Sequence, residues 1–127
     1  MGKPQGMVYV VDDDESVRKA LMRLLRSANL HGEAFASAEE FLSHPKQDQY
    51  ACILIDLRMP GLTGYDLQHK LVSQGIEIPV IVISASDDPK SRQNAKELGA
   101  VGFFRKPVDD QALLDAIWWV IGQSKAN

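Results

Sequence analysis

Four short apolar runs, each followed at once by a polar residue, constrain the fold of this chain more than any other feature. The runs are MVYVV before Asp12 and Asp13, ACILI before Asp56, VIVI before Ser84 and VGFFR before Lys106. Uninterrupted apolar runs of this length are typical of strands buried on both faces of a parallel sheet. Because the strands of such a sheet all point the same way, these polar side chains should collect at one edge, where open α/β sheets bind ligands.

Helix-like stretches separate the strand-like runs. We expect five strands, at residues 7–11, 31–36, 51–55, 80–83 and 101–104. Helical periodicity and capping residues predict five helices. One follows Asp14, two begin at the capping boxes Ser37–Glu40 and Thr63–Asp66, and two span 89–98 and 110–121. This alternation implies a parallel sheet with helices on both faces. The second strand is more polar than the central ones and should lie at an edge.

Three glycines predict where helices end. Gly75, Gly99 and Gly122 each follow the last apolar positions of a helical stretch. Glycine is favoured just past a helix because it adopts a left-handed backbone conformation at no steric cost. We therefore expect the last three helices to stop at these residues.

The residues at the strand ends are suited to phosphoryl transfer. Asp56 ends the most apolar strand, so its carboxylate should lie at the floor of the cleft, with Asp12 and Asp13 one strand away. Three carboxylates in one cleft favour a hard cation such as Mg²⁺, which prefers oxygen ligands. Lys106 offers a second positive charge and Ser84 a hydroxyl donor. Asp56 is then the candidate nucleophile that forms an aspartyl phosphate, a reaction that needs mainly positioning and charge neutralisation.

Length, charge and cysteine content limit the possible classes of protein further. The 127 residues suffice for one domain with a real core. A net charge of −3 gives no electrostatic reason for this segment to bind nucleic acid. The single cysteine, Cys52, excludes an intrachain disulfide, and its apolar neighbours favour a core residue over a redox centre. No run reaches membrane-spanning length and no targeting segment is visible, so we expect a cytoplasmic protein.

Four motifs surround the candidate site residues, in the order VVDDDESVR, ILIDLRMPGLTG, VIVISAS and GFFRKP. Together they resemble the response-regulator receiver domains of two-component signalling, and the resemblance extends over essentially the whole chain. It implies a flavodoxin-like doubly wound (βα)5 fold with strand order 2-1-3-4-5. It also implies that residues 1–127 are one receiver domain with no second domain in this chain, acting as a signalling switch and not as a turnover enzyme. The motifs are most similar to those of receivers attached to helix-turn-helix output domains.

The resemblance implies a role for each residue of the cleft. Asp56 would be the phosphoacceptor. Asp13 would bind Mg²⁺ or Mn²⁺ directly, Asp12 would act mostly through water, and the backbone carbonyl of Arg58 would complete the protein ligands. Lys106 would pair with a phosphoryl oxygen.

The same resemblance implies a conformational switch. Ser84 and the backbone amide of Ala85 would bind the phosphoryl group, and the ring of Phe103 would swing inward as Ser84 turns toward it. Serine stands here where threonine is commoner in the family, and phenylalanine where some members have tyrosine. The Lys106–Pro107 bond is expected to be cis.

Two surfaces are candidates for contacts with partners. The phosphodonor would be a sensor histidine kinase or a histidine phosphotransfer protein. The basic outer face of the first helix, formed by Arg18, Lys19, Arg23 and Arg26, is either solvated or the docking surface for that phosphodonor. In the last helix, Trp118 and Trp119 are adjacent, so both cannot point inward and at least one should be exposed. With the fourth helix and last strand they would form a homodimer face that phosphorylation strengthens. We expect no contact of this domain with nucleic acid or membrane.

Three other classes of protein fit parts of the sequence less well. A flavin-binding electron carrier of the same fold would need a Ser-, Thr- or Gly-rich phosphate loop, whereas DDDES would repel a phosphate. A phosphatase with an aspartyl intermediate would need a second Asp two positions after Asp56, where Arg58 stands. An adaptor that is never phosphorylated would not need the complete acidic set with Lys106.

Overall fold

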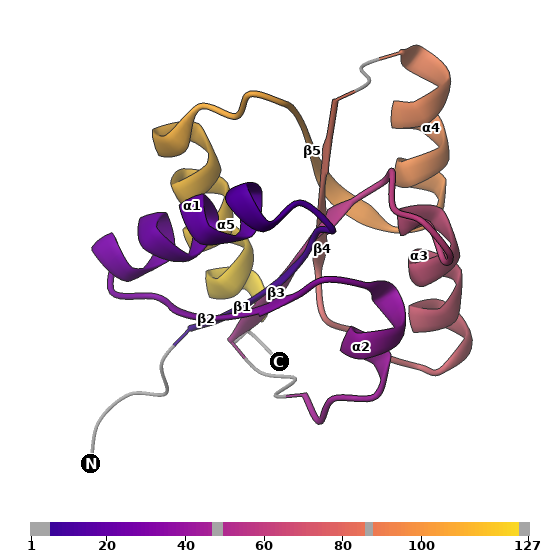
Figure 1. The fold of residues 1–127 in the computed structure, drawn as a ribbon, viewed down its shortest axis with the longest axis horizontal. Coiled ribbons are helices and arrows are strands. Elements are labelled where there is room, and N and C mark those ends of the chain that lie inside the picture. Colours follow the sequence, from indigo (N-terminus) through magenta and orange to yellow (C-terminus); the bar gives the residue numbers. More distant parts are fainter. Residues whose placement is uncertain (1–5, 47–49, 86–87, 125–127) are drawn as a thin grey trace.

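The computed structural model describes residues 6–46, 50–85 and 88–124, with residues 123 and 124 described by their backbone alone. Strands and helices alternate along this part of the chain (Figure 1). The strands are β1 (Met7–Val11), β2 (His31–Phe35), β3 (Ala51–Asp56), β4 (Val80–Ser84) and β5 (Ala100–Arg105). The helices are α1 (Glu15–Ser27), α2 (Ala38–Leu42), α3 (Gly64–Ser73), α4 (Pro89–Glu97) and α5 (Asp110–Ser124).

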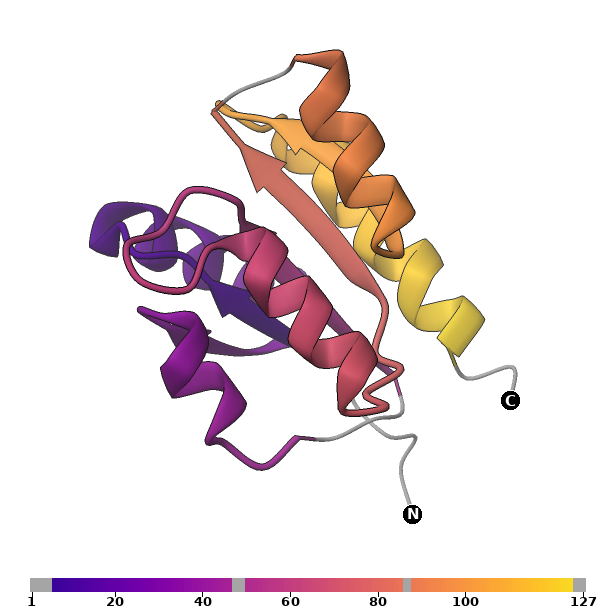
Figure 2. The same cartoon turned by 90° about the vertical axis from the view of Figure 1, so that its right-hand side faces the viewer.

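The five strands form one parallel sheet in the order β2-β1-β3-β4-β5, which confirms the predicted doubly wound fold. The more polar β2 lies at an edge, as expected. Figures 1 and 2 show α1 and α5 on one face of the sheet and α2, α3 and α4 on the other. In register, Val11 of β1 faces Ile55 of β3, and Asp56 faces Ile83 of β4. The carboxyl ends of the central strands therefore meet at one edge.

Two apolar cores hold these layers together, one on each face of the sheet. Every residue of β3 and β4 is buried, as their uninterrupted apolar sequences predicted. Burying one aliphatic side chain fully contributes about 1.5–3 kcal/mol, so these strands anchor the fold. Cys52 is among the buried residues, and burial raises the pKa of its thiol to about 12. It is a core residue, as predicted, and its thiol stays protonated and unreactive at neutral pH.

Three helices begin at the predicted capping residues. The side chain of Asp14 accepts hydrogen bonds from the N–H groups of Ser16 and Val17 at the start of α1. Thr63 and Asp66 form a reciprocal capping box at the start of α3. At α2 the prediction holds only in part: the Ser37 hydroxyl accepts from the Glu40 N–H, but the Glu40 carboxylate accepts from the Ala36 N–H. These caps satisfy backbone donors that have no partner within a helix.

The predicted helix ends are right at two glycines and wrong at the third. Gly75 and Gly99 follow α3 and α4 with φ angles of 70° and 101°, a conformation that favours glycine. By contrast, α5 continues through Gly122 to Ser124. The apolar face of α5, including Leu113, Ile117 and Ile121, is buried, and this packing outweighs the roughly 1 kcal/mol that a glycine costs within a helix. None of the described helices has the length and apolar character that spanning a membrane requires.

Candidate functional site

Three carboxylates come together at the carboxyl edge of the sheet. Asp12 follows β1 directly, Asp13 is the next residue, and Asp56 is the last residue of β3. One oxygen from each carboxylate lies within 4.8 Å of the others. Asp12 and Asp56 are only 3% and 6% exposed, whereas Asp13 is exposed to solvent. The predicted acidic cluster is therefore present, with one member facing outward.

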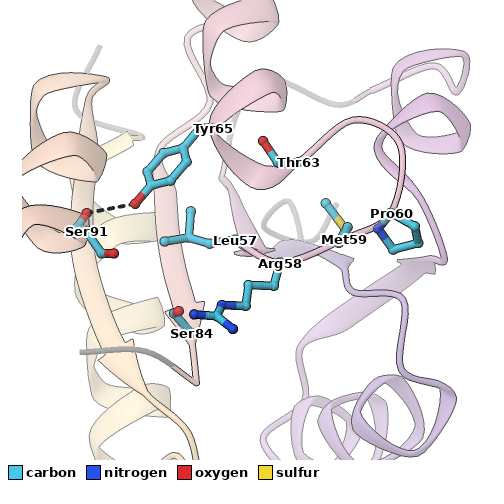
Figure 3. Close-up of a pocket in the computed structure, with 8 residues that line it drawn as sticks. All are labelled: Leu57, Arg58, Met59, Pro60, Thr63, Tyr65, Ser84 and Ser91. Carbon is cyan, nitrogen blue, oxygen red and sulfur yellow. Dashed lines mark hydrogen bonds between the residues drawn. The ribbon is translucent and has the colours of Figure 1, made fainter. Parts of the chain in front are cut away.

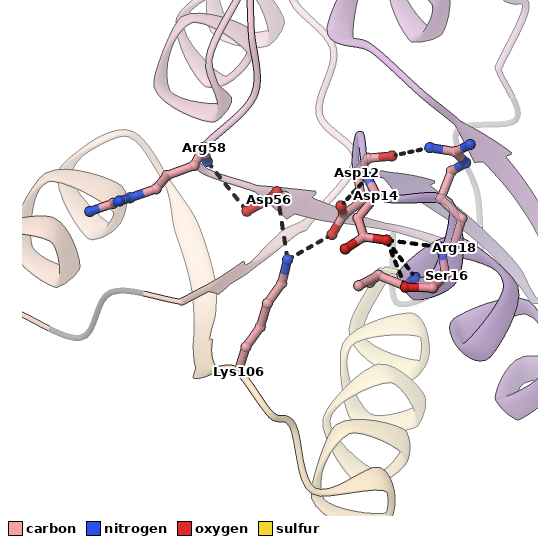
Figure 4. A network of polar contacts seen from close by, with 8 residues as sticks. Asp12, Asp14, Ser16, Arg18, Asp56, Arg58 and Lys106 are labelled. Atoms are coloured by element: carbon pink, nitrogen blue, oxygen red, sulfur yellow. Dashed lines mark hydrogen bonds and ion pairs between the residues drawn. The ribbon is translucent and has the colours of Figure 1, made fainter.

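Lys106 reaches into this cluster from the end of β5, across the end of β4 (Figure 4). Its Nζ lies 3.0 Å from Asp12 Oδ2 and 3.6 Å from Asp56 Oδ2. The Lys106 N–H donates to the Ser84 carbonyl at 2.8 Å, which fixes the backbone from which the side chain extends. The Lys106–Pro107 peptide bond is cis, as expected. One ammonium thus bridges two buried carboxylates from strands that are neighbours in the sheet.

Backbone donors orient the two buried carboxylates. The Asp14 N–H donates to Asp12 Oδ1 at 2.9 Å, and the Arg58 N–H donates to Asp56 Oδ1 at 3.3 Å. From α1, the Arg18 guanidinium donates to the Asp12 carbonyl at 2.8 Å. Arg18 is half-buried, although its spacing had suggested only a place on the outer, basic face of the helix. Sequence periodicity gave no sign of this bond, because it depends on where α1 packs against the end of β1.

Burial and neighbouring negative charge both disfavour the ionised form of the Asp56 carboxyl. Burial raises the pKa of Asp56 to about 6, and the negative charge of Asp12 adds to the effect. Lys106 and the Arg58 N–H oppose the shift but do not cancel it. Burial also disfavours the charged ammonium of Lys106, yet its hydrogen bond to Asp12 and the two carboxylate charges raise its pKa. At neutral pH both groups are therefore charged, and the cluster retains excess negative charge.

Gly64 lets the first turn of α3 pack directly against the end of β3. The Gly64 N–H donates to the Leu57 carbonyl at 3.1 Å, which closes the loop that follows Asp56. A Cβ atom at residue 64 would lie 2.6 Å from the Asp56 carbonyl oxygen and 2.7 Å from Leu57 Cα, closer than real Cβ contacts allow. The position of Asp56 therefore depends on a glycine that sequence analysis had not singled out.

A pocket of about 530 Å³ opens beside the carboxylates, between the β3–α3 loop and α4. Its walls include Leu57, Arg58, Thr63, Tyr65, Ser84 and Ser91. Figure 3 shows the Arg58 side chain extending toward Ser84, which is 1% exposed at the end of β4. Ala85 follows in an exposed bend. Ser84, the predicted hydroxyl donor, thus lines a pocket next to the loop that follows Asp56.

Of the remaining predicted residues, Phe103 lies on β5 and the tryptophans lie on α5. Phe103 is half-buried on the side of the sheet that α3 and α4 cover. The Arg92 guanidinium of α4 lies 4.8 Å from the centre of its ring, a cation–π distance that sequence analysis had not foreseen. Trp118 and Trp119 are 47% and 65% exposed. The expectation that at least one tryptophan is exposed is therefore confirmed, and both are.

The donor set of the cluster fits a hard divalent cation. Its carboxylate oxygens are of the type that Mg²⁺ and Mn²⁺ prefer, and they lie close enough together to share one ion. Burial is the main cause of the raised pKa of Asp56, and the negative charges of Asp12 and Asp13 add to it. A divalent cation would offset these negative charges. Asp12, Asp13 and Asp56 are thus able to hold such an ion.

The chain matches a sequence profile and curated relatives. The sequence profile described as "Response regulator receiver domain" matches residues 8–118. The response regulator protein TmoT of Ectopseudomonas mendocina is 40% identical over 117 residues, which cover 92% of this chain and 53% of TmoT. The transcriptional regulatory protein FixJ of Azorhizobium caulinodans is 38% identical over 117 residues, which cover 92% of this chain and 56% of FixJ.

The solved structures agree with the sequence matches. The structure titled "Low Resolution Structure of Response Regulator StyR" superposes with a TM-score of 0.87 at 41% identity, covering 95% of this chain and 61% of that chain. This chain spans about half the length of the curated relatives it matches.

Proposed function

The chain belongs to the response regulator receiver domain family of two-component systems, and we propose that it is a phosphorylation-activated switch with Asp56 as its phosphoacceptor. The phosphodonor is a sensor histidine kinase or a histidine phosphotransfer protein. The observation that carries this proposal is the buried Asp56 carboxylate, held beside two further carboxylates and 3.6 Å from the Lys106 ammonium. Proteins of this family are regulators and not turnover enzymes.

The transfer itself asks for an ionised carboxylate and for neutralisation of phosphoryl charge. With a pKa of about 6, Asp56 is ionised at neutral pH and able to attack phosphorus. The new carboxylate–phosphorus bond replaces the phosphorus–nitrogen bond of the donor phosphohistidine, whose imidazole leaves. Lys106 pairs with one phosphoryl oxygen, and the Ser84 hydroxyl and Ala85 amide donate hydrogen bonds to others. Attack of water on the phosphoryl group later restores the carboxylate.

Asp12, Asp13 and Asp56, together with the Arg58 backbone carbonyl, would hold Mg²⁺ or Mn²⁺. When bound, the ion neutralises the charge that gathers on the phosphoryl oxygens. Asp12 already accepts from Lys106 and from the Asp14 N–H, whereas Asp13 is exposed beside it. We infer that Asp13 binds the ion directly and that Asp12 acts mostly through water.

Removing the Asp13 carboxylate is therefore expected to abolish measurable Mg²⁺ binding, and removing that of Asp12 to weaken it less. Calorimetric titration of Asp13→Asn and Asp12→Asn at pH 7 would measure both effects. The exposed Asp115→Asn on α5 serves as a control for the loss of one negative charge. Undiminished affinity in Asp13→Asn would remove Asp13 from the ligand set.

The phosphorylated receiver is proposed to act on an output segment or partner. The relatives TmoT and FixJ are named as a response regulator and a transcriptional regulator, and each is about twice as long as the matched region. We infer that this receiver controls transcription through another segment or protein. The net charge of −3 gives the receiver itself no electrostatic reason to contact DNA.

Ser84 and Phe103 are proposed to transmit the signal to a homodimer face formed by α4, β5 and α5. In Ser84→Ala, Asp56 should still be phosphorylated, but self-association through Trp118 and Trp119 should no longer strengthen, because no hydroxyl turns toward the phosphoryl group. In the wild type, beryllofluoride should tighten the dimer about 5- to 150-fold. Sedimentation measurements, with Trp119→Glu as control, would test this. Equal tightening of the dimer in Ser84→Ala would show that the Ser84 hydroxyl is not needed for the switch.

Acetyl phosphate gives a direct test of the proposed function. After incubation with acetyl phosphate and Mg²⁺, the intact mass of the wild type should rise by one phosphoryl group. Asp56→Asn should show no increase, since an amide is not a nucleophile toward phosphorus at neutral pH. Labelling of Asp56→Asn to the wild-type extent would show that another residue is the acceptor.

A further inference from the structure

Helix α4 has little apolar contact with the rest of the molecule. Its sequence PKSRQNAKE contains one buried residue, Ala95, whereas the neighbouring α3 buries Gly64, Leu67, Gln68 and Leu71. Burial of apolar surface normally fixes the place of a surface helix. The place of α4 must therefore depend strongly on polar contacts.

Two side chains of α3 supply such contacts, and both donate to backbone carbonyls of α4. The Tyr65 hydroxyl donates to the Ser91 carbonyl at 3.3 Å, as Figure 3 shows, and Gln68 Nε2 donates to the Ala95 carbonyl at 3.1 Å. The donors are three residues apart on α3 and the acceptors four apart on α4, so each pair lies about one helical turn from the other. We call these two bonds the α3–α4 ladder.

The Gln68 bond also completes the carboxyl end of α4. In a regular helix the Ala95 carbonyl would accept from the N–H of Gly99, but that N–H donates to the Lys96 carbonyl at 2.9 Å. Gln68 Nε2 thus acts as a cap supplied by a neighbouring helix. Gln68 is 1% exposed, and its Oε1 is buried without a partner among the described residues, an unfavourable arrangement that the Nε2 bond has to offset.

Open space flanks the ladder at both ends. The pocket of about 530 Å³ includes Tyr65 and Ser91 in its walls. A second pocket, of about 290 Å³, includes Gln68, Leu71 and Leu98. Close packing would resist displacement of a helix, and here it is interrupted on both sides of the contact. The seam between α3 and α4 therefore has room for a second arrangement.

We propose that Tyr65 and Gln68 are positioning residues that hold α4 in its resting place, and that phosphorylation shifts α4 by breaking the α3–α4 ladder. The second part rests on the proposed function. α4 begins five residues after Ser84, and its Arg92 lies over the Phe103 ring. A displacement of either Ser84 or Phe103 therefore acts on a helix that a few polar contacts retain. Phosphorylation biases α4 only if the two states differ in these contacts, and the ladder supplies that difference.

Amide hydrogen exchange of the unphosphorylated protein tests the ladder. Gln68→Met keeps the side-chain volume but removes the donor, and Tyr65→Phe removes one hydroxyl. Each variant should speed exchange of the α4 amides at 92–98 by about 3- to 10-fold, because each loses one hydrogen bond that holds α4 closed. Exchange in β3 and α5 should not change. Gln111→Met is the matched control, since its Nε2 bonds to Asp115 on the exposed face of α5.

The exchange measurements decide both parts of the proposal. Unchanged α4 exchange in both Gln68→Met and Tyr65→Phe would overturn it, as would equal acceleration in β3 and α5, which indicates general destabilisation. In the wild type, beryllofluoride with Mg²⁺ should speed α4 exchange, and it should do so less in Gln68→Met, where the ladder is already broken. If the wild-type protein binds beryllofluoride without any change in α4, the link to phosphorylation is wrong, whereas failure to bind it would contradict the proposed function.

Discussion

At pH 7, without divalent cations, Asp56→Asn is expected to have a free energy of unfolding about 3 kcal/mol higher than the wild type. The pKa of Asp56 is about 6 in the folded protein against 3.8 ordinarily, so the folded state binds more protons between these pH values. Ionisation of Asp56 therefore destabilises the folded state as the pH rises from about 4 through 6. The loss is about 1.4 kcal/mol for each pH unit that separates the folded and unfolded pKa values. An asparagine does not ionise and avoids this loss.

The higher free energy of unfolding of Asp56→Asn should disappear on acidification. Near pH 4 most Asp56 is protonated in the folded wild type, so the two proteins should unfold at similar denaturant concentrations. Asp66→Asn is a control of opposite sign, because hydrogen bonds from Thr63 lower the pKa of Asp66 and its ionised form stabilises the fold at neutral pH. Urea unfolding followed by circular dichroism at both pH values would measure the differences. A loss of stability in Asp56→Asn at pH 7 would contradict the prediction that ionised Asp56 destabilises the folded state.

The second large effect is expected for Gly64→Ala, which should lower the free energy of unfolding by about 1–3 kcal/mol through overpacking. The new methyl group would meet the Asp56 carbonyl oxygen at 2.6 Å, so the end of β3 or the first turn of α3 must move. Because Asp56 lies at that point, phosphorylation by acetyl phosphate should slow as well. Denaturant unfolding and the rate of phosphoryl mass gain would measure the two effects.

Gly122→Ala is the matched control, since among the described residues no atom outside the neighbouring residues and backbone of α5 lies within 4 Å of the added methyl group. In that variant the free energy of unfolding should rise by up to about 1 kcal/mol, because alanine is the better helix former. Gly64→Ala with wild-type stability and phosphorylation rate would show that the contact with Asp56 is easily relieved. A loss of stability in Gly122→Ala would contradict the continuation of α5 through this residue.

The features that sequence analysis predicted are those that depend on local patterns. The apolar runs are buried strands, Asp14 and Thr63 cap helices, and the second strand lies at an edge. The error at Gly122 has the same origin, because a glycine after an apolar stripe resembles a helix stop unless the packing of that stripe is known. Gly75 has an exposed backbone with positive φ, whereas Gly122 follows Ile121, which is buried in the core.

The convergence of Asp12, Asp13, Asp56 and Lys106 was predictable because the topology of a parallel sheet brings strand ends to one edge. Their roles in phosphoryl transfer stay a prediction. The contacts that sequence analysis missed each join a helix to another element or to the end of a strand: Arg18 to the Asp12 carbonyl, Gly64 against Asp56, and Gln68 to the Ala95 carbonyl. Each depends on how a helix packs, and no spacing along the chain encodes that.

Locating the acyl phosphate on the chain tests the central claim most directly. Protein treated with acetyl phosphate and Mg²⁺ is reduced with borohydride, which converts an aspartyl phosphate into homoserine, and peptide mass spectrometry then finds the altered residue. We predict homoserine at position 56 and at no other aspartate, with Asp12 and Asp13 unchanged, and none in protein that was not phosphorylated. Homoserine at position 12 or 13, or phosphorylated protein with an intact Asp56, would contradict the account.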